Sequence, residues 1–288
     1  MKTLNIIGSG RVGRACGRLW SQARVLAIQD VLTRSRDSAA AGAAFIGAGR
    51  PVASLREMRP ADVWMIATRD DAIVASCTML AQSGMLAAGN IVFHVSGARP
   101  SSDLAPAGKS GALIASVHPI KTFTDAESAV RSFAGTFCSA EGDPGALAVL
   151  RPAFEEIGAR VFDIATGLKS IYHAGGVFAC NYLVALIEAA VRAHEQAGIA
   201  RADSLQALEP MVRETVDAIF AQGPARALTG PIARGDVETV KRQLAAVDAW
   251  DAGAGAIYRS LGLVAVDVAQ AAGLDAARAD ELRSALEK

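Results

Sequence analysis

The chain has 288 residues, of which 51% are hydrophobic and 20% charged, so it can bury a large core and is long enough for two domains. This composition excludes an intrinsically disordered protein. Lysine and arginine together number 29, as do aspartate and glutamate. The resulting net charge of zero excludes a general nucleic-acid binder, because such proteins need a basic surplus to displace counterions.

No segment predicts export or membrane insertion. Residues 1–4 lead into a predicted strand without an apolar leader, which predicts no signal peptide. No stretch of about 18 apolar residues lacks a polar interruption, which predicts no membrane span. The cysteines lack metal-ligand spacing and lie in apolar segments, which predicts buried thiols in a reducing cytoplasm. They are Cys16, Cys77, Cys138 and Cys180.

Up to about residue 165, short apolar runs alternate with helical stretches. Successive Val, Ile and Leu residues are typical of strands buried on both faces of a parallel sheet. The predicted strands are 4–7, 25–32, 63–67, 91–95, 113–117, 136–139 and 160–163. The predicted helices include 12–22, 35–45, 71–82 and 146–157. This alternation predicts an α/β fold, with an N-terminal Rossmann domain over residues 1–165 and a doubly wound, mainly parallel sheet.

After residue 166 the strand pattern stops and an all-α domain for substrate binding and dimerisation is predicted over 166–288. Its predicted helices are 170–197, 204–221, 237–246, 255–272 and 275–286. The first is apolar nearly all round as far as Val191, and such a helix must be buried on every side. We expect a homodimer to cover it, the alternative being the central helix of a monomeric bundle.

A glycine-rich turn follows the first predicted strand and opens a helix, as a dinucleotide-binding loop does. Gly8 permits the tight turn, Gly10 lets a pyrophosphate approach the backbone, and Gly13 lets helix and strand pack closely. Free N–H groups of the first helical turn would face the phosphates. The predicted cofactor contacts here are Gly8, Ser9, Gly10, Arg11, Val12 and Gly13. The alternative is a glycine turn without a ligand.

The residues after the second strand indicate which dinucleotide binds. An NAD site usually has an acidic residue there, bonded to the ribose 2′-hydroxyl. Asp30 comes too early and should still lie within the strand. The next residues offer two guanidiniums and two hydroxyls that suit a 2′-phosphate. They are Thr33, Arg34, Ser35 and Arg36. The sequence therefore predicts NADP, the alternative being two solvated surface arginines.

The predicted strand 63–67 ends at Ala67 and Thr68, beside the expected position of the nicotinamide ribose. We expect the backbone of these two residues to contact the cofactor. Asp70 or Asp71 follows directly, and an acidic residue at this place is typical of a helix N-cap. We therefore expect these carboxylates to cap the next helix rather than to take part in chemistry.

Ser96 follows the predicted strand 91–95 and His118 follows the predicted strand 113–117, at the same edge of the sheet. Histidine can donate and accept protons near neutral pH, as interconversion of a carbonyl and an alcohol requires. His118 is therefore a candidate proton donor, with a structural hydrogen bond as the alternative. Ser96 is a candidate for orienting a carbonyl. His94, inside a strand, is expected to be structural.

The first C-terminal helix carries a polar stripe. Lys169, His173 and Asn181 are spaced by multiples of four residues and therefore follow one slanting line. Gly175 and Gly176 each weaken a helix by about 1 kcal/mol, which indicates close approach of another backbone or a ligand. We expect Asn181 to be buried and hydrogen-bonded, either in the site or in a contact between helices.

A segment joining two predicted helices, 227–236, supplies a further polar group. Asp236 is expected to cap the following helix. Capping does not account for Arg234, whose guanidinium suits a substrate carboxylate. Thr229 and Arg234 are therefore the predicted substrate-binding residues of this segment.

The chain closely resembles bacterial Rossmann-like proteins whose helical C-terminal domain is catalogued as a domain of unknown function. The stretches that carry the resemblance are 7–13, 94–97, 118–123, 169–183 and 228–236. It implies an NADP-dependent oxidoreductase, distantly similar to pyrroline-5-carboxylate reductase, prephenate dehydrogenase, ketopantoate reductase and the β-hydroxyacid dehydrogenases. Some members are thought to reduce ketopantoate.

Two correspondences follow from the resemblance. Ser96 and His118-Pro119 look like a serine and a His-Pro pair of prephenate dehydrogenases. Lys169 looks like the helix lysine of the β-hydroxyacid dehydrogenases. There the chain departs from the pattern, because His173 stands where those enzymes have an asparagine.

The sequence thus predicts a cytoplasmic, homodimeric, NADP-dependent oxidoreductase that reduces a small carbonyl or imine, with a 2-keto acid such as ketopantoate as the expected substrate. The proton donor stays open between His118 and the pair Lys169 and His173, while Ser96 and Asn181 orient the carbonyl. No metal is required, because side-chain donors can polarise a carbonyl. The alternative is a dinucleotide-responsive binding or regulatory protein without turnover, since fold alone does not establish catalysis.

Overall fold

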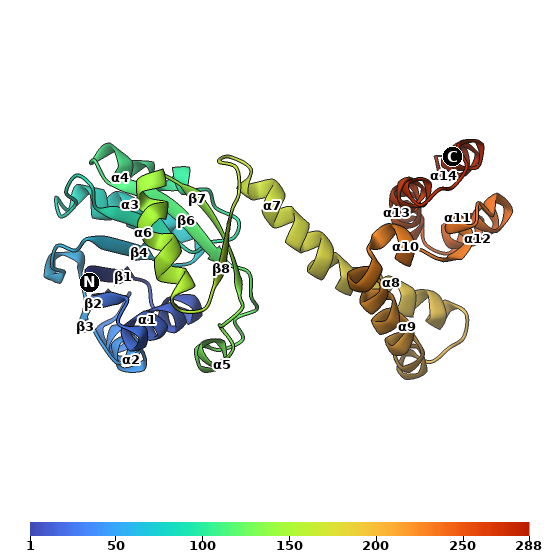
Figure 1. The fold of residues 1–288 in the computed structure, drawn as a ribbon. Helices are drawn as coiled ribbons and strands as arrows, with labels where there is room; N and C mark the ends of the chain where they lie inside the picture. The colour runs from blue at the N-terminus through green and yellow to red at the C-terminus, as the bar shows by residue number, and fades with distance from the viewer. Residues whose placement is uncertain (288) are drawn as a thin grey trace. The chain divides into compact units, whose positions relative to one another are not determined.

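The computed structural model describes residues 1–287 and forms two compact units, Met1–Val177 and Phe178–Lys288 (Figure 1). The division falls inside a long helix rather than near residue 165. This helix begins on the first unit, where Lys169 and Tyr172 contact side chains of the sheet. The two units are described in turn.

The first unit contains an eight-stranded sheet in the order β3-β2-β1-β4-β5-β6-β7-β8. The strands are β1 (Lys2–Ile7), β2 (Leu26–Leu32), β3 (Arg50–Val52), β4 (Val63–Ile66), β5 (Ile91–His94), β6 (Leu113–Pro119), β7 (Phe137–Gly142) and β8 (Arg160–Asp163). Only β6 and β7 pair antiparallel, so the predicted doubly wound, mainly parallel sheet is confirmed. Strand order reverses between β1 and β4, and ligands of such folds bind at this switch point.

Helices cover both faces of the sheet, because the central strands are apolar on successive residues. The helices around the sheet are α1 (Arg11–Ala23), α2 (Arg36–Ile46), α3 (Ile73–Gln82), α4 (Ala105–Lys109), α5 (Ala126–Arg131) and α6 (Pro144–Glu155), with 3-10 turns η1 (Leu55–Glu57), η2 (Asp70–Ala72) and η3 (Ser101–Leu104). Helix α7 (Lys169–Gly176) begins the long helix. Ile6 and Met65 pack with α1, α2 and α6, whereas Ile7 and Ile66 pack with α3 and α4 on the opposite face.

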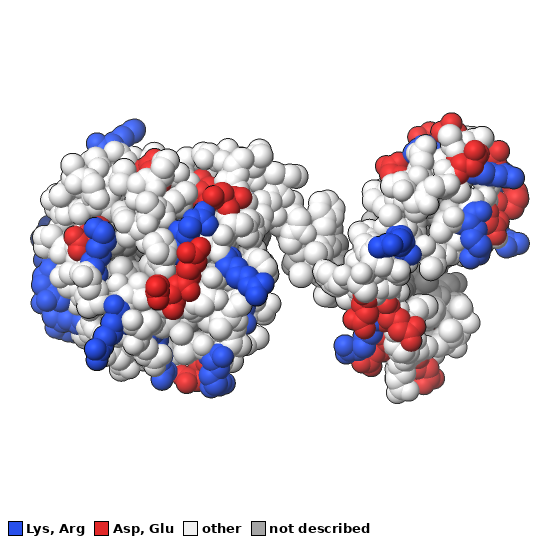
Figure 2. Space-filling model, in the orientation of Figure 1, with Lys and Arg blue, Asp and Glu red and all other residues white. Residues whose placement is uncertain are grey.

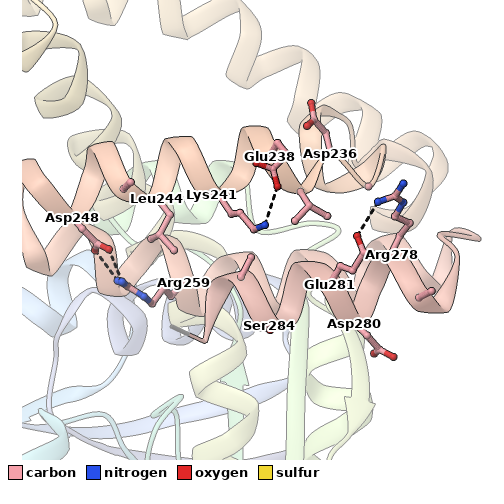
Figure 3. Close-up of a pocket in the computed structure, with 15 residues that line it drawn as sticks. Asp236, Glu238, Lys241, Leu244, Asp248, Arg259, Arg278, Asp280, Glu281 and Ser284 are labelled. Atoms are coloured by element: carbon pink, nitrogen blue, oxygen red, sulfur yellow. Dashed lines mark hydrogen bonds and ion pairs between the residues drawn. The ribbon is translucent and has the colours of Figure 1, made fainter.

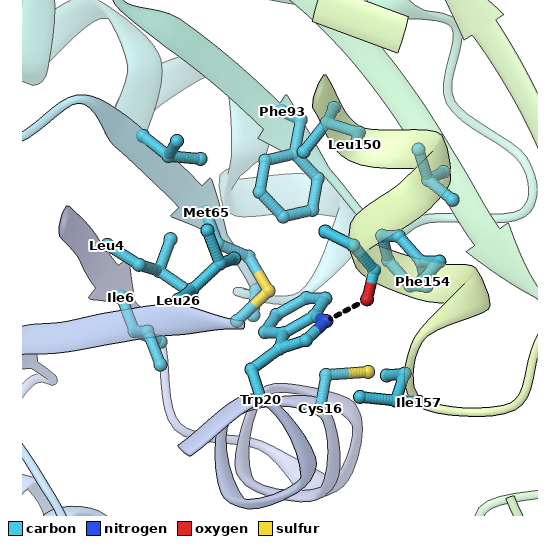
Figure 4. Packing of buried hydrophobic residues seen from close by; sticks show 14 of the residues in the cluster. Leu4, Ile6, Cys16, Trp20, Leu26, Met65, Phe93, Leu150, Phe154 and Ile157 are labelled. Carbon is cyan, nitrogen blue, oxygen red and sulfur yellow. Dashed lines mark hydrogen bonds between the residues drawn. The ribbon is translucent and has the colours of Figure 1, made fainter. Parts of the chain in front are cut away.

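Trp20 of α1 lies at the centre of the larger core (Figure 4). Its ring meets those of Phe93 and Phe154 edge-on, with centroid distances of 6.3 and 5.0 Å. Its Nε1–H donates to the carbonyl of Ala153 at 2.8 Å, as a buried indole requires. Helices α1 and α6 are therefore fixed against each other beneath the glycine-rich turn.

The second unit is helical, which confirms the predicted class of the C-terminal region. After the π-helical turn η4 (Val177–Asn181) come α8 (Tyr182–Gln196), α9 (Arg201–Gln222), α10 (Pro224–Ala227), α11 (Gly230–Ala233), α12 (Val237–Trp250), α13 (Ala252–Ala271) and α14 (Ala276–Leu286). Asp236 caps α12 as predicted, accepting from the Thr239 N–H at 3.0 Å. Helices α10 and α11 are too short to show a hydrophobic period and were not predicted.

Apolar side chains of the long helix are exposed in the single chain. Residues 178–185 are all exposed, so the predicted burial of this helix on every side is not achieved by the chain itself. Cys180 lies there and is exposed, which corrects the prediction of four buried cysteines, whereas the other three are buried. On the face drawn in Figure 2, charges of both signs are interspersed over the units, and α7 shows no charged surface.

Two helices are long and apolar enough to cross a membrane by length and composition, Lys169–Gln196 and Ala252–Ala271. This differs from the sequence expectation of no span. Length and composition alone are weak evidence, because a helix from a core or an interface of a soluble protein has the same properties.

Candidate functional site

The glycine-rich turn has the backbone predicted for a phosphate loop. Gly8 has a φ of +94°, and a Cβ there would lie 2.6 Å from the carbonyl carbon of Ala67, so only glycine fits. A Cβ at Gly13 would lie 2.9 Å from the Gly8 oxygen, so this glycine permits the close packing of helix and strand. A Cβ at Gly10 would meet only the Ala67 oxygen, at 3.8 Å. The surface above Gly10 is therefore open to a ligand.

Helix α1 presents unused N–H groups at this turn. Its N-cap, Gly10, has no side-chain acceptor, and the Gly10 carbonyl accepts from the N–H of Arg14. The preceding N–H groups, of Arg11, Val12 and Gly13, therefore lack an acceptor one helical turn earlier. Such a group of N–H donors at a helix N-terminus binds anions.

Side chains around the turn are held by their neighbours. The Ser9 hydroxyl accepts from Nε of Arg14 at 3.2 Å, and Arg11 donates to the Phe123 carbonyl at 3.0 Å. The backbone of residues 67–68 packs directly against Gly8, so the predicted contact of Ala67 and Thr68 with a cofactor lies beside the loop.

The segment predicted to bind a 2′-phosphate follows β2. Ser35 is the N-cap of α2 and accepts from the Ser38 N–H at 3.2 Å, while the Thr33 hydroxyl donates to the Ser35 carbonyl at 2.8 Å. Arg34 and Arg36 are exposed, and within residues 1–287 neither forms an ion pair. Two free guanidiniums thus flank a capped helix N-terminus.

Asp30 lies within β2 as predicted, and its carboxylate forms ion pairs with two arginines. It is fully buried and pairs with Arg59 Nη2 at 2.8 Å and Arg50 Nε at 3.0 Å. Burial raises the pKa of Asp30, but the hydrogen bonds from the two arginines lower it more, so the net shift is downward. The acid of β2 is therefore charged, neutralised and unavailable to a ribose hydroxyl.

His94 is structural, as predicted. It is fully buried, and its Nε2 lies 3.1 Å from the Pro100 carbonyl, which can only accept, so Nε2 carries the proton. Its Nδ1 accepts from the Ser96 N–H at 3.2 Å. Burial lowers the pKa of His94 to about 4, so the ring is neutral at pH 7.

Ser96 has a different position from the one predicted for a group that orients a carbonyl. It is buried, and its hydroxyl oxygen accepts the N–H groups of Ala98 and Arg99 at 3.2 and 3.1 Å. This is the pattern of a serine that shapes a turn. The hydroxyl therefore positions the backbone at Gly97 rather than facing open space.

Lys169 is fully buried, and its Nζ donates to the Ser116 hydroxyl at 2.5 Å. That hydroxyl lies 3.3 Å from Nδ1 of His94. Burial lowers the pKa of Lys169 to about 8, against a smaller opposite influence of Glu141 and Asp70. No carboxylate in the described part of the chain lies within ion-pair distance of this ammonium group.

His118 and His173 converge over Gly97. The half-buried His118 ring has Nδ1 3.3 Å from the Tyr172 hydroxyl, and its centroid is 6.5 Å from that of the exposed His173. A Cβ at Gly97 would lie 2.8 Å from His118 Nε2 and 3.0 Å from His173 Nδ1. Burial, and after it the charge of Lys169, lowers the pKa of His118 to about 4.

Strand register explains why these groups meet. His94 and Ser116 are partners on the parallel strands β5 and β6, and His118 is the partner of Ser139 on antiparallel β7. Ser116 and His118 lie two residues apart and share a face of β6. The sequence analysis missed Ser116, which that alternation could have revealed, and Tyr172, which only the docking of α7 brings to His118.

Neither Asp70 nor Asp71 caps α3, which corrects the sequence prediction. Asp70 begins the turn η2, and the N-cap of α3, Ala72, makes no side-chain cap. Asp71 pairs instead with Arg69 at 3.1 Å. The exposed Asp70 carboxylate raises the pKa of both Lys169 and His118, so the end of β4 lies near these two residues.

Three predicted site residues lie in the second unit. Asn181 is exposed in η4, which corrects its expected burial. Thr229 and Arg234 are exposed at the two ends of α11. Their roles remain predictions.

A groove in the second unit is lined by α12, α13 and α14 (Figure 3). Its charged side chains are paired: Lys241 with Glu238, Arg259 with Asp248, and Arg278 with Glu281. Asp280 pairs with Arg283 beside the groove, and Asp236 caps α12, so each cation that lines the groove is already paired with a carboxylate. Among residues 1–287 no group of three or more His, Cys, Asp or Glu side chains is placed to hold a metal ion.

Comparisons with known proteins agree with this architecture. Residues 2–119 match the Rossmann-like domain family, and residues 136–265 match the family described as Domain of unknown function (DUF2520). The chain therefore joins a Rossmann-like domain to a DUF2520 domain, which confirms the resemblance drawn from the sequence. Among curated proteins no sequence matches the chain.

Several solved structures share the fold. Protein TM1727 from Thermotoga maritima is 26% identical with a TM-score of 0.75, covering 93% of this chain and 98% of its own. BF3122 from Bacteroides fragilis, provisionally named an NADP oxidoreductase, is 18% identical with a TM-score of 0.73, covering 93% and 97%. The imine reductase BcSIRED from Bacillus cereus is 17% identical with a TM-score of 0.58, covering 99% and 92%.

Acid should destabilise the first unit through its buried histidines. The pKa of His94 is about 4 in the fold against an ordinary value of 6.5, so the unfolded chain takes up its proton first as the pH falls. The contribution of neutral His94 to the free energy of unfolding is fully present above pH 6.5. It is lost as the pH falls through 4, and the loss amounts to at most about 3 kcal/mol. Urea unfolding between pH 7.5 and 4 measures it.

His94→Gln should show a smaller loss over this range, because glutamine does not titrate. His194→Gln, the same change in the second unit, is the matched control and should keep the wild-type slope. Identical pH slopes for all three proteins would contradict the assignment.

Proposed function

We propose that this chain, which joins a Rossmann-like domain to a DUF2520 domain, is an NADP-dependent reductase of a small carbonyl or imine substrate. The observation that carries the proposal is the placement of two groups of residues in one compact unit. An open glycine loop with unused helix N–H groups follows β1, and His118, His173 and Lys169 gather at the carboxyl ends of β5 and β6. In doubly wound sheets this edge receives the dinucleotide.

The loop residues fit a dinucleotide pyrophosphate. Gly10 has no atom within 3.8 Å of where a side chain would begin, and the N-terminus of α1 has no cap to compete for its N–H groups. When bound, the nicotinamide would supply a hydride to the substrate. Gly8, Gly10 and Gly13 would hold the diphosphate, and the backbone at 67–68 would lie beside the nicotinamide half.

NADP is proposed over NAD because of the charges after β2. Asp30 is neutralised by two arginines and cannot serve a ribose 2′-hydroxyl. Arg34 and Arg36 carry free charge beside the N-cap Ser35, an arrangement that suits a phosphate dianion. Several solved relatives, BF3122 among them, are named for NADP or act as reductases.

The substrate would lie against His118 and His173. Their ring nitrogens over Gly97 are on the accessible side of the cluster, whereas Lys169 is covered. As hydride adds to the carbonyl carbon, the oxygen takes up a proton, and two converging imidazoles can stabilise and protonate it. A 2-keto acid such as ketopantoate is the proposed substrate, and Thr229 and Arg234 remain the proposed contacts of its carboxylate.

Reduction of a 2-keto acid is directly measurable. Purified protein should oxidise NADPH with at least one member of a panel of 2-keto acids that includes ketopantoate, with cyclic imines as a second panel. His118→Asn should reduce kcat about 10²- to 10⁴-fold with little change in NADPH affinity. His194→Asn is the matched control and should keep wild-type turnover. Tight NADPH binding without turnover on either panel would favour the binding-protein alternative.

The cofactor preference depends on Arg34. Its charge-assisted contact with the 2′-phosphate should contribute about 1.5–3 kcal/mol, so Arg34→Ala should weaken NADPH binding about 10- to 150-fold while NADH binding barely changes. Fluorescence titration gives both constants. Arg213→Ala, an exposed arginine of α9, is the control. Equal losses for both cofactors, or a wild type that prefers NADH, would refute NADP.

We also propose a cytoplasmic homodimer in which a second copy covers the long helix. Phe178 and Val184 are 65% and 71% exposed in the single chain. At Gly175 and Gly176 an added Cβ would meet nothing within 4 Å, so another backbone has room to approach. The same helix carries Glu188, paired with Arg201 in water-accessible positions, which suits a protein interface better than lipid.

Sedimentation velocity tests the dimer. The wild type should sediment as a dimer at micromolar concentration, and Val184→Asp should weaken association about 10²-fold or more, because an unpaired charge buried in an interface costs several kcal/mol. Val74→Asp, on α3 of the first unit, should leave the dimer intact. A monomeric wild type, a dimer indifferent to Val184→Asp, or partition into a membrane fraction would each refute the proposal.

A further inference from the structure

Lys169 cannot meet a substrate in the way an exposed lysine would. Its side chain is fully buried, and its one hydrogen bond to a protein group goes to the Ser116 hydroxyl. An ammonium group buried without a carboxylate is costly, so a chain keeps one only where packing enforces it. The charge of Lys169 lies close to His118, because Ser116, which Lys169 contacts, and His118 are two residues apart on the same face of β6.

The hydrogen bonds running from Lys169 have one direction. The Pro100 carbonyl accepts from Nε2 of His94, which leaves Nδ1 of this neutral ring as an acceptor. That acceptor is taken by the Ser96 N–H at 3.2 Å, so the Ser116 hydroxyl, whose oxygen accepts from Lys169, donates to the Ser96 carbonyl at 3.5 Å. Every proton is directed into the sheet, and none of these bonds points toward the histidines over Gly97.

The bonds on the other side of His118 have a complementary direction. The Tyr172 phenol, whose pKa is raised by burial, is neutral and can donate to Nδ1 of His118 at 3.3 Å. The Ser139 hydroxyl is buried beside it, as the strand partner of His118. With Nδ1 accepting from Tyr172, the N–H of a neutral His118 is at Nε2, the nitrogen over Gly97.

We propose that Lys169 is a positioning residue rather than the proton donor: its buried ammonium holds Ser116 and places a positive charge near His118, whose Nε2–H then faces the substrate oxygen over Gly97. This inference rests on the proposed reductase function. A neutral imidazole that donates a hydrogen bond stabilises the developing negative charge on the substrate oxygen without transferring its own N–H proton. The transferred proton then comes from the exposed His173, which regains it from water.

The charged and titratable groups around His118 come from four elements. They are Lys169, Tyr172 and His173 of α7, His94 of β5, Asp70 of η2 and, beyond Lys169, Glu141 of β7. Of these, Lys169 is the cation that is fully buried and hydrogen-bonded to the strand of His118. Removing its charge without changing its length therefore isolates its influence.

NMR titration of the histidine side chains tests the inference without turnover. In the wild type the pKa of His118 should lie near 4, and in Lys169→Met it should rise measurably but stay below 6.5, because burial, the larger cause, remains. Lys109→Met, the same change at an exposed position of α4, should leave it unchanged. Lys169→Gln provides a second neutral variant, so that misfolding of one does not end the test. An unchanged His118 pKa in a folded Lys169 variant would overturn the proposal.

Two measurements separate this role from direct proton donation. Mass spectrometry after acetylation should show Lys169 protected relative to Lys109, both with and without NADPH. The Lys169→Met variant should keep about 1–10% of wild-type kcat, because a positioning residue does not itself transfer the proton. Rapid acetylation of Lys169, or loss of all turnover with an unshifted His118 pKa, would identify Lys169 as the donor while leaving the reductase function standing.

Discussion

Burial of the Lys169 ammonium group is the constraint on which the site depends. The ammonium group is buried from water and hydrogen-bonded to one hydroxyl, that of Ser116. Its lowered pKa, about 8, reflects how burial disfavours the charged form. Stability alone would favour an apolar side chain of the same length. A cost retained at the end of β6, beside two converging imidazoles, indicates selection for chemistry rather than for folding. The same bond ties the start of α7 to the sheet.

The sheet topology places that site beside the cofactor loop. Parallel strands end at one edge, so the turn after β1, the backbone after β4 and the polar groups of β5 and β6 lie along one line. Antiparallel β7 then adds Ser139 opposite His118. The DUF2520 match begins at residue 136, so it includes the last two strands of the sheet as well as the helices. The boundary between the matched families therefore differs from the boundary between the compact units.

Local signals in the sequence predicted the fold well and the site only in part. Glycines 8, 10 and 13 and the apolar strands were recognisable because turns and buried strands are specified by residues near each other in the chain. The bond from Lys169 to Ser116 joins residues 53 positions apart, and no local pattern encodes it. The turn-shaping hydrogen bonds of Ser96 were not predicted, because a serine that shapes a turn and one that faces a substrate look alike in sequence. The exposure of Asn181 and Cys180 depends on what covers the helix, which a hydrophobic period cannot specify.

The long helix connects the site with assembly. Its first residue is fixed by a buried bond to the sheet, whereas residues 178–185 are exposed in the single chain. The exposed part begins in a π-helical turn, Val177–Asn181, and such turns commonly mark functional positions in helices. In the proposed dimer, a second copy would cover the exposed part and so restrain the helix that carries Lys169, Tyr172 and His173.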